Sequence, residues 1–270
     1  MAKTVVISCW FGKRFDKPNE ETVLANFKAA IKYLVKSVLP ARLYPLFNVQ
    51  SVVPIAPNNC DRAIFFTNNK LLKKEVLLKG WKYEYLQAGE IGEIGEIDSI
   101  DSSLIAKKIK FLQLEQRILN ELYSFDYVLY VDSRAIVDDI VHINSLCDKG
   151  LVIRYSPEYK NKNTVWDEIN EAKVVERYAA AMPETISFVE NKIKDGEYTD
   201  QNKVMATGVI LYKLGDMKYR NRIISLCNEV YDTCVKLNQP ECQIIWCILS
   251  QPYDDLMTKV KAQNIQTRST

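Results

Sequence analysis

The sequence predicts a single α/β domain in which a mixed, mostly parallel central sheet is flanked by helices. Apolar segments of strand length alternate with helical segments over roughly the first 150 residues, a pattern typical of parallel sheets. The chain has 270 residues, of which 47% are hydrophobic, and this is enough for one substantial core. No linker rich in Pro, Gly and Ser divides it, so we expect one domain over residues 1–270.

Segments rich in β-branched and aromatic residues are predicted to be strands. In chain order they are residues 4–10, 61–67, 81–86, the first part of 125–137, 151–154 and 204–211. Residues 49–55 are also apolar and fit either a strand or an insertion.

Segments with apolar residues every three or four positions are predicted to be helices. They are residues 22–39, 70–78, 106–122, 166–181, 184–194, 219–237 and 242–249. Pro40 ends the first of them, Pro183 separates two of them, and Pro240 precedes the last. The Gly-Glu-Ile repeat at 89–98 is expected to be an acidic loop, with a lid role left open, and the polar tail after Tyr253 is expected to be peripheral.

Composition excludes several classes of protein. A net charge of +2 does not fit a general nucleic-acid binder, so no nucleic-acid partner is expected. No apolar run approaches the ~20 residues of a membrane span. The first apolar segment is too short for a secretory signal, so we expect a cytoplasmic location.

Cysteine and histidine usage narrows the chemistry further. The 7 cysteines are odd in number and form no CxxC pair, so a disulfide framework is not expected. Cys227 and Cys234 lie on one face of a predicted helix and fit core packing. The single His142 does not support a histidine metal cluster. GxGxxG, GxxxxGK[ST], GxSxG and HExxH motifs are absent.

Asp132 is the strongest candidate for a site residue. It ends the apolar run that begins at Phe125, and polar groups at the carboxyl end of a strand in an open α/β sheet lie where ligands bind. Because a buried charge needs a partner, we expect this carboxylate to meet a metal ion, an arginine or a ligand. The structural alternatives are a helix N-cap and a surface pair with Arg134.

Three blocks of sequence carry a resemblance to a known family. They are residues 62–69 with Gly80 and Trp81, residues 108–119 leading to 125–134, and residues 208–211 followed by 239–243. The central block resembles the metal-binding strand of GT-A-fold glycosyltransferases. More narrowly, the ordered set is similar to a family of glycosyltransferase-like domains with plant mucilage- and pollen-related members and many bacterial ones.

The resemblance implies a GT-A-like domain that moves a sugar from a nucleoside-diphosphate sugar to a glycan or other hydroxyl acceptor. Residues 1–150 would bind the nucleotide-sugar, residues 151–252 would form the acceptor side, and 253–270 would be a tail. The residues implied at the donor are Gly12, Lys13, Arg14, Thr67, Asn68, Lys110, Arg117, Arg134, Gly208 and Gln243. Those implied on the acceptor side are Arg154, Glu158, Trp166 and Asp167.

The same resemblance implies catalytic roles for three carboxylates. Asp132 would hold a divalent cation, Mn²⁺ or Mg²⁺, or polarise the diphosphate. Glu241 or Asp167 would deprotonate the acceptor hydroxyl in an inverting reaction, whereas a retaining reaction needs no such base.

Plain structural alternatives stand beside these roles. Lys110 and Arg117 could be solvated, Asn68 could serve only a turn, and Glu241 could serve only the helix dipole. Gly208 inside a strand indicates a close approach, either of a ligand or of a packed helix.

Two departures from the family pattern bear on the metal and on catalysis. The usual Asp-x-Asp is Asp132-Ser133-Arg134 here, so the second carboxylate is missing. A single Asp could still hold a cation through water and the donor diphosphate. The Arg-Asp-Gln of the last block lacks its Asp, which leaves Glu241 and Gln243. The alternatives are a nucleotidyltransferase acting on sugar phosphates and a catalytically degenerate glycan-binding member.

Overall fold

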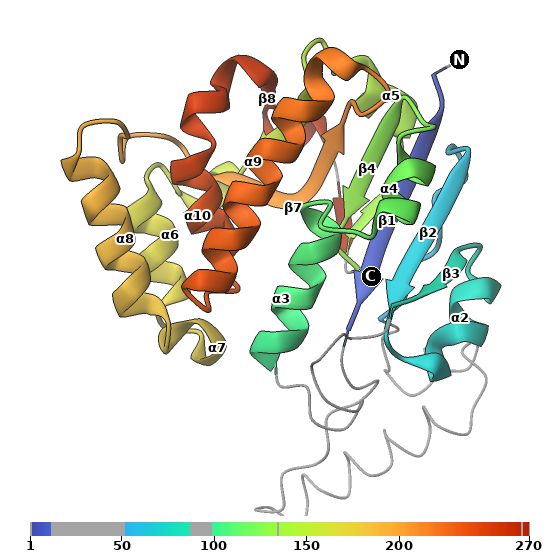
Figure 1. The fold of residues 1–270 in the computed structure, drawn as a ribbon, viewed down its shortest axis with the longest axis horizontal. Coiled ribbons are helices and arrows are strands. Elements are labelled where there is room, and N and C mark those ends of the chain that lie inside the picture. The colour runs from blue at the N-terminus through green and yellow to red at the C-terminus, as the bar shows by residue number, and fades with distance from the viewer. Residues whose placement is uncertain (1, 12–51, 87–98, 134, 266, 270) are drawn as a thin grey trace, which may run out of the picture.

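The computed structural model describes residues 2–11, 52–86, 99–133, 135–265 and 267–269. Within these ranges a seven-stranded sheet has the order β3-β2-β1-β4-β7-β6-β8 (Figure 1). Its strands are β1 Thr4–Trp10, β2 Arg62–Thr67, β3 Lys82–Tyr85, β4 Tyr127–Val131, β6 Leu151–Tyr155, β7 Met205–Tyr212 and β8 Met257–Val260. A small second sheet pairs β5 Ala135–Val137 with β9 Thr267–Ser269.

The sheet is mixed and mostly parallel, as predicted. The pairs β1–β2, β2–β3, β1–β4 and β6–β8 are parallel, and only β7 runs antiparallel to its neighbours β4 and β6. The chain leaves β1 toward β2 and β3, and then returns to place β4 on the other side of β1. A crevice opens at such a reversal, at the carboxyl ends of the strands. The residues that follow β1 and β4 therefore flank the expected ligand position.

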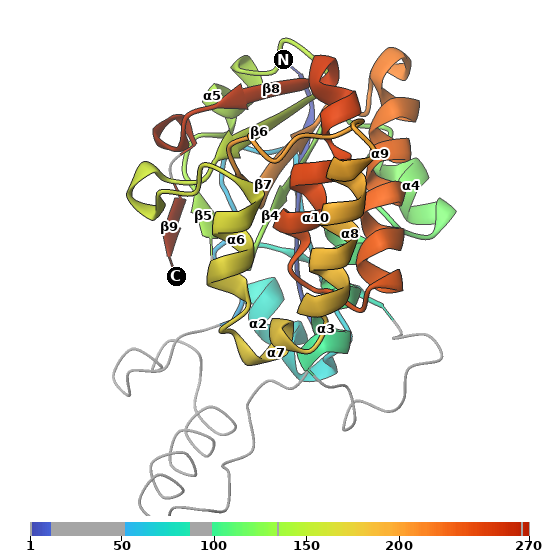
Figure 2. The same cartoon turned by 90° about the vertical axis from the view of Figure 1, so that its left-hand side faces the viewer.

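Helices cover both faces of the sheet. They are α2 Lys73–Leu78, α3 Ser99–Lys110, α4 Gln116–Leu122, α5 Ile140–Ser145, α6 Val165–Ala172, α7 Glu176–Ala179, α8 Met182–Lys194, α9 Met217–Lys236 and α10 Cys242–Leu249. Short 3₁₀ turns occupy Lys70–Leu72, Glu158–Lys160, Gln251–Leu256 and Ala262–Asn264. One buried cluster joins α3, α9 and α10 to the sheet, and a second joins α2 and α5 to the opposite face. Figure 2 shows α9 and α10 on one side and α5 on the other.

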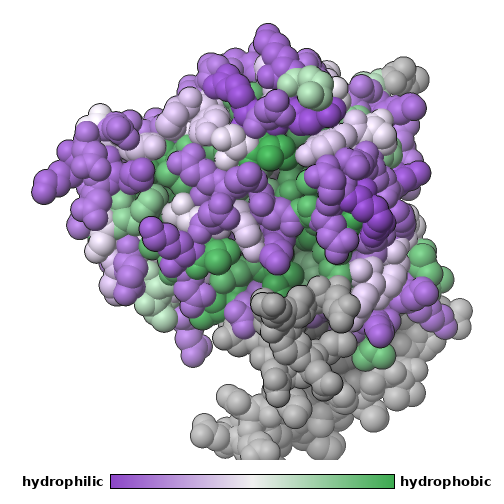
Figure 3. Space-filling model, in the orientation of Figure 1, coloured by the Kyte–Doolittle hydropathy of each residue, from purple (hydrophilic) through white to green (hydrophobic). Residues whose placement is uncertain are grey.

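Successive side chains of β1 point to opposite faces of the sheet. Val5 and Ile7 of β1 belong to the cluster under α3, α9 and α10, whereas Val6 between them belongs to the other cluster. Both faces are buried, so the strand lacks a regular alternation of polar and apolar residues, and its polar residues Thr4 and Ser8 are buried as well. On the face shown in Figure 3, apolar side chains surface in separate areas between hydrophilic ones.

The helix predicted over 106–122 is wrong in one respect, because the chain forms two helices there. After α3, Leu112 adopts the left-handed conformation with φ 57°, and its N–H donates to the Ile109 carbonyl. The Gln113 N–H donates to the Lys108 carbonyl, which completes a Schellman ending. Glycine is usual at such a position, so the sequence did not signal the break. The turn buries Phe111 and Leu112, and their burial offsets the backbone strain.

Other boundaries also differ from the predictions. The helix expected over 166–181 is divided into α6 and α7. Pro183 lies in the first turn of α8 instead of separating two helices, a position where its missing N–H costs nothing. The tail after Tyr253 is not merely peripheral, because it supplies β8 to the sheet and buries Leu256 and Met257.

Some expectations fall outside the described residues, namely the helix at 22–39, the Gly-Glu-Ile repeat and most of 49–55; residues 52–55 are not a strand. All seven cysteines are free thiols, and Cys227 and Cys234 are buried in α9, as predicted. Among the described helices, none combines the length and apolar character needed to cross a membrane.

Candidate functional site

Asp132 directly follows β4, at the reversal of the sheet. Two residues earlier Tyr130 belongs to the cluster under α3, α9 and α10, so strand alternation directs Asp132 to the same side. The Asp132 N–H donates to the Gly208 carbonyl over 2.8 Å, which continues the β4–β7 ladder by one bond. Its side chain is 46% exposed, so the carboxylate is accessible to a ligand while it also contacts groups of the protein.

Two buried groups contact one oxygen of this carboxylate. The Tyr130 hydroxyl donates to Asp132 Oδ1 over 2.6 Å, and Lys110 Nζ lies 3.4 Å from the same oxygen. Burial, followed by the negative charge of Asp132, raises the pKa of Tyr130 well above its ordinary value. The tyrosine therefore remains a hydrogen-bond donor at neutral pH.

Lys110 is only 3% exposed, which rules out the solvated alternative for it. Its ammonium lies 5.2 Å from the centre of the Tyr130 ring. It also lies 3.4 Å from Thr207 Oγ1 and 3.8 Å from Cys242 Sγ. Among the residues that the structure describes, Asp132 is the carboxylate paired with this ammonium group. Residues of β4, β7 and α10 surround the ammonium group, which is carried by α3.

The close approach predicted at Gly208 is made by Asp132 itself. A Cβ added to Gly208 would lie 2.8 Å from Asp132 Oδ2, closer than side chains normally pack. Any larger residue here would push the carboxylate out of its position. The absence of a side chain at Gly208 therefore leaves the space that the Asp132 carboxylate occupies.

Two further residues of this site were missed in the sequence. Cys9, on β1, is buried, and burial together with the charge of Asp132 raises its pKa to about 12. Lys107 lies one turn before Lys110 on α3 and is partly exposed. Burial alone would lower the pKa of Lys107, but interactions with Cys242, Asp132 and Glu241 outweigh it and raise the pKa. The sequence feature that could have identified Lys107 is its i, i+3 spacing from Lys110, because this spacing places both lysines on one face of a helix.

Glu241 is the N-cap of α10. Its carboxylate accepts from the Gln243 N–H over 3.2 Å, while its own N–H donates to the Gln239 side chain over 2.9 Å. Burial and the charge of Glu241 raise the pKa of the Tyr178 hydroxyl. Glu241 acts electrostatically on Lys107 as well, which links this carboxylate to the Asp132 side of the site.

Gln243 is held by a buried ionic network that the sequence did not reveal. Its side-chain amide donates to Glu168 Oε1 over 3.0 Å. Glu168 Oε2 lies 2.6 Å from Lys162 Nζ, and the same ammonium lies 2.8 Å from Glu171. Burial, and then the charge of Glu241, raise the pKa of Glu168 despite the Lys162 ammonium.

Asp167 has a local structural role. Its carboxylate accepts from the backbone N–H groups of Asn163 and Thr164, and the Thr164 hydroxyl accepts in turn from the Asp167 N–H. This capping box begins α6 and holds the pKa of Asp167 below its ordinary value. The other acceptor-side candidates are also bonded: Trp166 donates to Asp200, and Arg154 donates to the Ile265 carbonyl. Glu158 lies in a 3₁₀ turn.

The remaining donor-side candidates are placed as follows. Thr67, the last residue of β2, and Asn68 directly after it are buried, and Thr67 Oγ1 accepts from the Asn69 N–H, so the predicted turn is present. Arg117 is 64% exposed and lies 2.7 Å from Glu84 of edge strand β3. Gly12, Lys13, Arg14 and Arg134 lie outside the described residues.

The described residues around Asp132 do not fit a resident divalent cation. Mg²⁺ and Mn²⁺ take an octahedral set of oxygen ligands. Here one oxygen of the single carboxylate already faces a hydroxyl donor and an ammonium group. Over the part of the chain that the structure describes, no three His, Cys, Asp or Glu side chains gather as a metal cluster.

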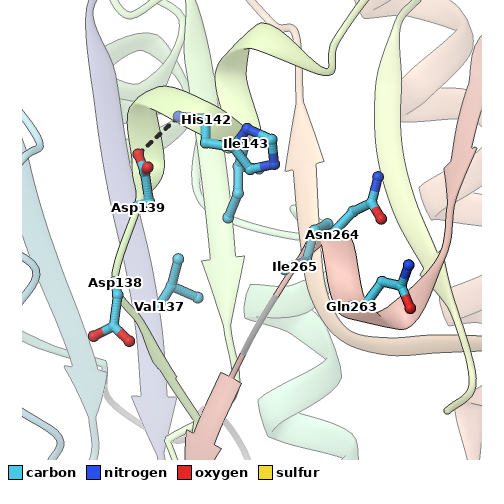
Figure 4. A pocket seen from close by; sticks show the side chains of 8 residues that line it. All are labelled: Val137, Asp138, Asp139, His142, Ile143, Gln263, Asn264 and Ile265. Atoms are coloured by element: carbon cyan, nitrogen blue, oxygen red, sulfur yellow. Dashed lines mark hydrogen bonds between the residues drawn. The ribbon is translucent and has the colours of Figure 1, made fainter.

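A separate cavity of about 260 Å³ lies between α5 and the segment 263–265 (Figure 4). It is lined by Val137, Asp138, Asp139, His142, Ile143, Gln263, Asn264 and Ile265. Asp139 accepts from the His142 N–H as the N-cap of α5, so its position is explained by the helix. The cavity belongs to the α5 face of the sheet, whereas Asp132 points to the α3 face.

No family model matches the chain, and no curated protein does, so the resemblance to the plant and bacterial family stays a prediction. Distant solved structures do align with it. WbbM, a bifunctional glycosyltransferase, aligns over 96% of this chain and 39% of its own length, with 11% identity and a TM-score of 0.45.

The galactosyltransferase LgtC, solved with donor and acceptor sugar analogues, aligns over 96% of this chain and 74% of its own, with 14% identity and a TM-score of 0.42. Mouse xyloside xylosyltransferase 1 aligns over 96% of this chain and 86% of its own, with 9% identity and a TM-score of 0.43.

Proposed function

We propose that this protein is a glycosyltransferase that moves a hexose or pentose from a nucleoside-diphosphate sugar to a hydroxyl acceptor such as a glycan. The observation that carries the proposal is the position of Asp132. A half-exposed carboxylate follows β4 at the reversal of a mostly parallel sheet, 3.4 Å from the Lys110 ammonium, and both it and Glu241 act electrostatically on Lys107. Carboxylates and cations at such an edge suit transfer from a phosphorylated donor.

In this proposal different residues act on the leaving diphosphate, on the donor sugar and on the acceptor hydroxyl. Lysine ammonium groups at the strand ends stabilise the negative charge that develops on the leaving diphosphate. Asp132, oriented by the Tyr130 hydroxyl and the Lys110 ammonium, accepts hydrogen bonds from the donor sugar. In an inverting reaction Glu241 takes the proton of the acceptor hydroxyl, and in a retaining reaction leaving-group stabilisation dominates.

Donor hydrolysis tests the proposal. Wild type, Asp132→Asn and the matched control Asp195→Asn, an exposed residue at the end of α8, would be incubated with a panel of UDP-, GDP- and CDP-sugars. We expect nucleoside diphosphate release by wild type and the control, and a loss of about 10²–10³-fold in Asp132→Asn, the range for removing one preorganised electrostatic group. Equal turnover by the three proteins would remove Asp132 from the mechanism.

The nucleotidyltransferase alternative is tested in the same assay. It predicts pyrophosphate release from a nucleoside triphosphate in the presence of a sugar phosphate. A glycan-binding protein without turnover would release neither product while still binding glycans in calorimetry.

A further inference from the structure

We propose that Lys107 supplies the positive charge at the donor diphosphate while Lys110 neutralises Asp132, so that this site binds a nucleoside diphosphate without a divalent cation. Lys107 contacts the phosphate oxygens, and Lys110 is the positioning residue that neutralises and orients Asp132. This inference rests on the proposed function and deepens it, because it concerns how the same site holds the same donor.

The Asp132 carboxylate already has charged and hydrogen-bonding partners within the protein. A metal-binding carboxylate presents uncompensated negative charge to its ion, but the charge of Asp132 is already met by the Lys110 ammonium 3.4 Å away. The Tyr130 hydroxyl takes a further lone pair of the same oxygen at 2.6 Å. A divalent cation on this carboxylate would therefore lie close to a buried ammonium group and be repelled by it.

Lys110 cannot move away from Asp132 to make room for a cation. Its ammonium is enclosed by the Tyr130 ring, Thr207 Oγ1 and Cys242 Sγ, which come from three different elements. The side chain is 3% exposed, so leaving this place would open a void between α3, β7 and α10. The positive charge beside Asp132 is therefore a fixed part of the fold.

Lys107 lies one helical turn from Lys110 and is accessible to a ligand. It lies on the same face of α3 as Lys110, one turn nearer the start of the helix, and it is partly exposed where Lys110 is buried. The negative charges of Asp132 and Glu241 both favour its charged form and help to raise its pKa. Without a donor these carboxylates compensate it, and phosphate oxygens replace them when the donor binds. A lysine is a common point-charge partner for phosphate.

Calorimetric binding of UDP, GDP and CDP tests this inference, each measured once in EDTA and once in MnCl₂. The variants are Lys107→Met, Lys110→Met and the control Lys108→Met, whose side chain is exposed on the same helix. We expect one of the nucleotides to bind wild type with dissociation constants that agree within about threefold in the two buffers. Lys107→Met should weaken binding at least tenfold, and Lys108→Met should leave it unchanged.

Lys110→Met separates positioning from folding. If it retains a cooperative thermal transition, nucleotide binding should become stronger in MnCl₂ than in EDTA, because Asp132 is no longer neutralised. Should it fail to fold, Lys107→Met, at a partly exposed position, decides the question alone.

Nucleotide binding by wild type that requires MnCl₂, or equal binding by Lys107→Met and Lys108→Met, would overturn the lysine inference and leave the proposed function standing. Failure of every nucleotide and nucleotide-sugar to bind in both buffers would overturn the two together.

Discussion

The carboxylate of Asp132 owes its position to the absence of a side chain on a neighbouring strand. Gly208→Ala would place a methyl group 2.8 Å from Asp132 Oδ2 and turn the carboxylate away from Tyr130 and Lys110. We expect donor turnover to fall at least tenfold, since small displacements of a positioned group are costly in rate. Kinetics at saturating donor would measure this.

Gly196→Ala is the matched control for that variant. Gly196 has φ 75° and nothing within 4 Å of an added Cβ, so alanine there strains the backbone without touching another group. Its stability should fall by about 1 kcal/mol with turnover preserved. Loss of turnover in both glycine variants alike would show that stability, and not the place of Asp132, is being measured.

Glu241 allows the stereochemical course to be tested at a single residue. A glutamine can still accept from the Gln243 N–H as an N-cap, so Glu241→Gln should fold normally. In an inverting enzyme we expect its kcat to fall by about 10²–10⁴ with little change in KM, because only the base is lost. Near-normal kcat would exclude Glu241 as the base and favour a retaining reaction.

At the scale of elements, the start of α6 depends on its capping box. Thr164→Ala removes the hydroxyl that accepts from the Asp167 N–H and should cost about 1 kcal/mol of unfolding free energy. Urea unfolding at pH 7 would measure it. A cost near zero would mean that tertiary packing alone begins this helix.

The same box predicts a pH dependence. Hydrogen bonds from Thr164 and Asn163 lower the pKa of Asp167 below its ordinary value of 3.8. Its stabilisation is therefore complete above pH 3.8 and is lost as the pH falls through the lower pKa of the folded state. The stability difference between wild type and Asp167→Asn should shrink on acidification below pH 3.8. A difference that stays constant there would contradict this assignment.

Glu168 of α6, which accepts from Gln243 of α10, is held in a buried ion pair with Lys162. Lys162→Met leaves Glu168 buried without its 2.6 Å partner, and we expect it to lose about 3–5 kcal/mol of unfolding free energy. The double variant Lys162→Met/Glu168→Leu should recover much of this loss, because no charge is left unpaired. A double variant less stable than the single one would instead make the Gln243 bond to Glu168 the dominant contribution.

At the scale of the whole molecule, the C-terminal segment completes the sheet. A chain ending at Pro252 would lose β8 and the buried side chains of Leu256, Met257 and Ile265. Each such side chain contributes about 1.5–3 kcal/mol on burial, so the total approaches the 5–15 kcal/mol that stabilises most domains. We expect the truncated chain to lose its cooperative thermal transition. An unchanged melting temperature would restore the view of this segment as a peripheral tail.

Much of the fold was predictable because strands and helices each have a characteristic local pattern of apolar residues. The strands at 4–10, 62–67 and 205–212 follow from runs of β-branched and aromatic residues, and α10 follows from an apolar segment after Pro240. The break at Leu112 was not predictable, because the left-handed residue is a leucine and its burial is a tertiary property.

The sequence by itself determined the fold class, the order of most elements and the placement of Asp132 at the end of a central strand. Only the tertiary structure decided what surrounds that carboxylate. Lys110 meets Thr207 and Cys242 across 97 and 132 positions of sequence, and Gly208 meets Asp132 across two antiparallel strands. Local patterns report which face of an element is buried, whereas charge pairing depends on which elements pack together.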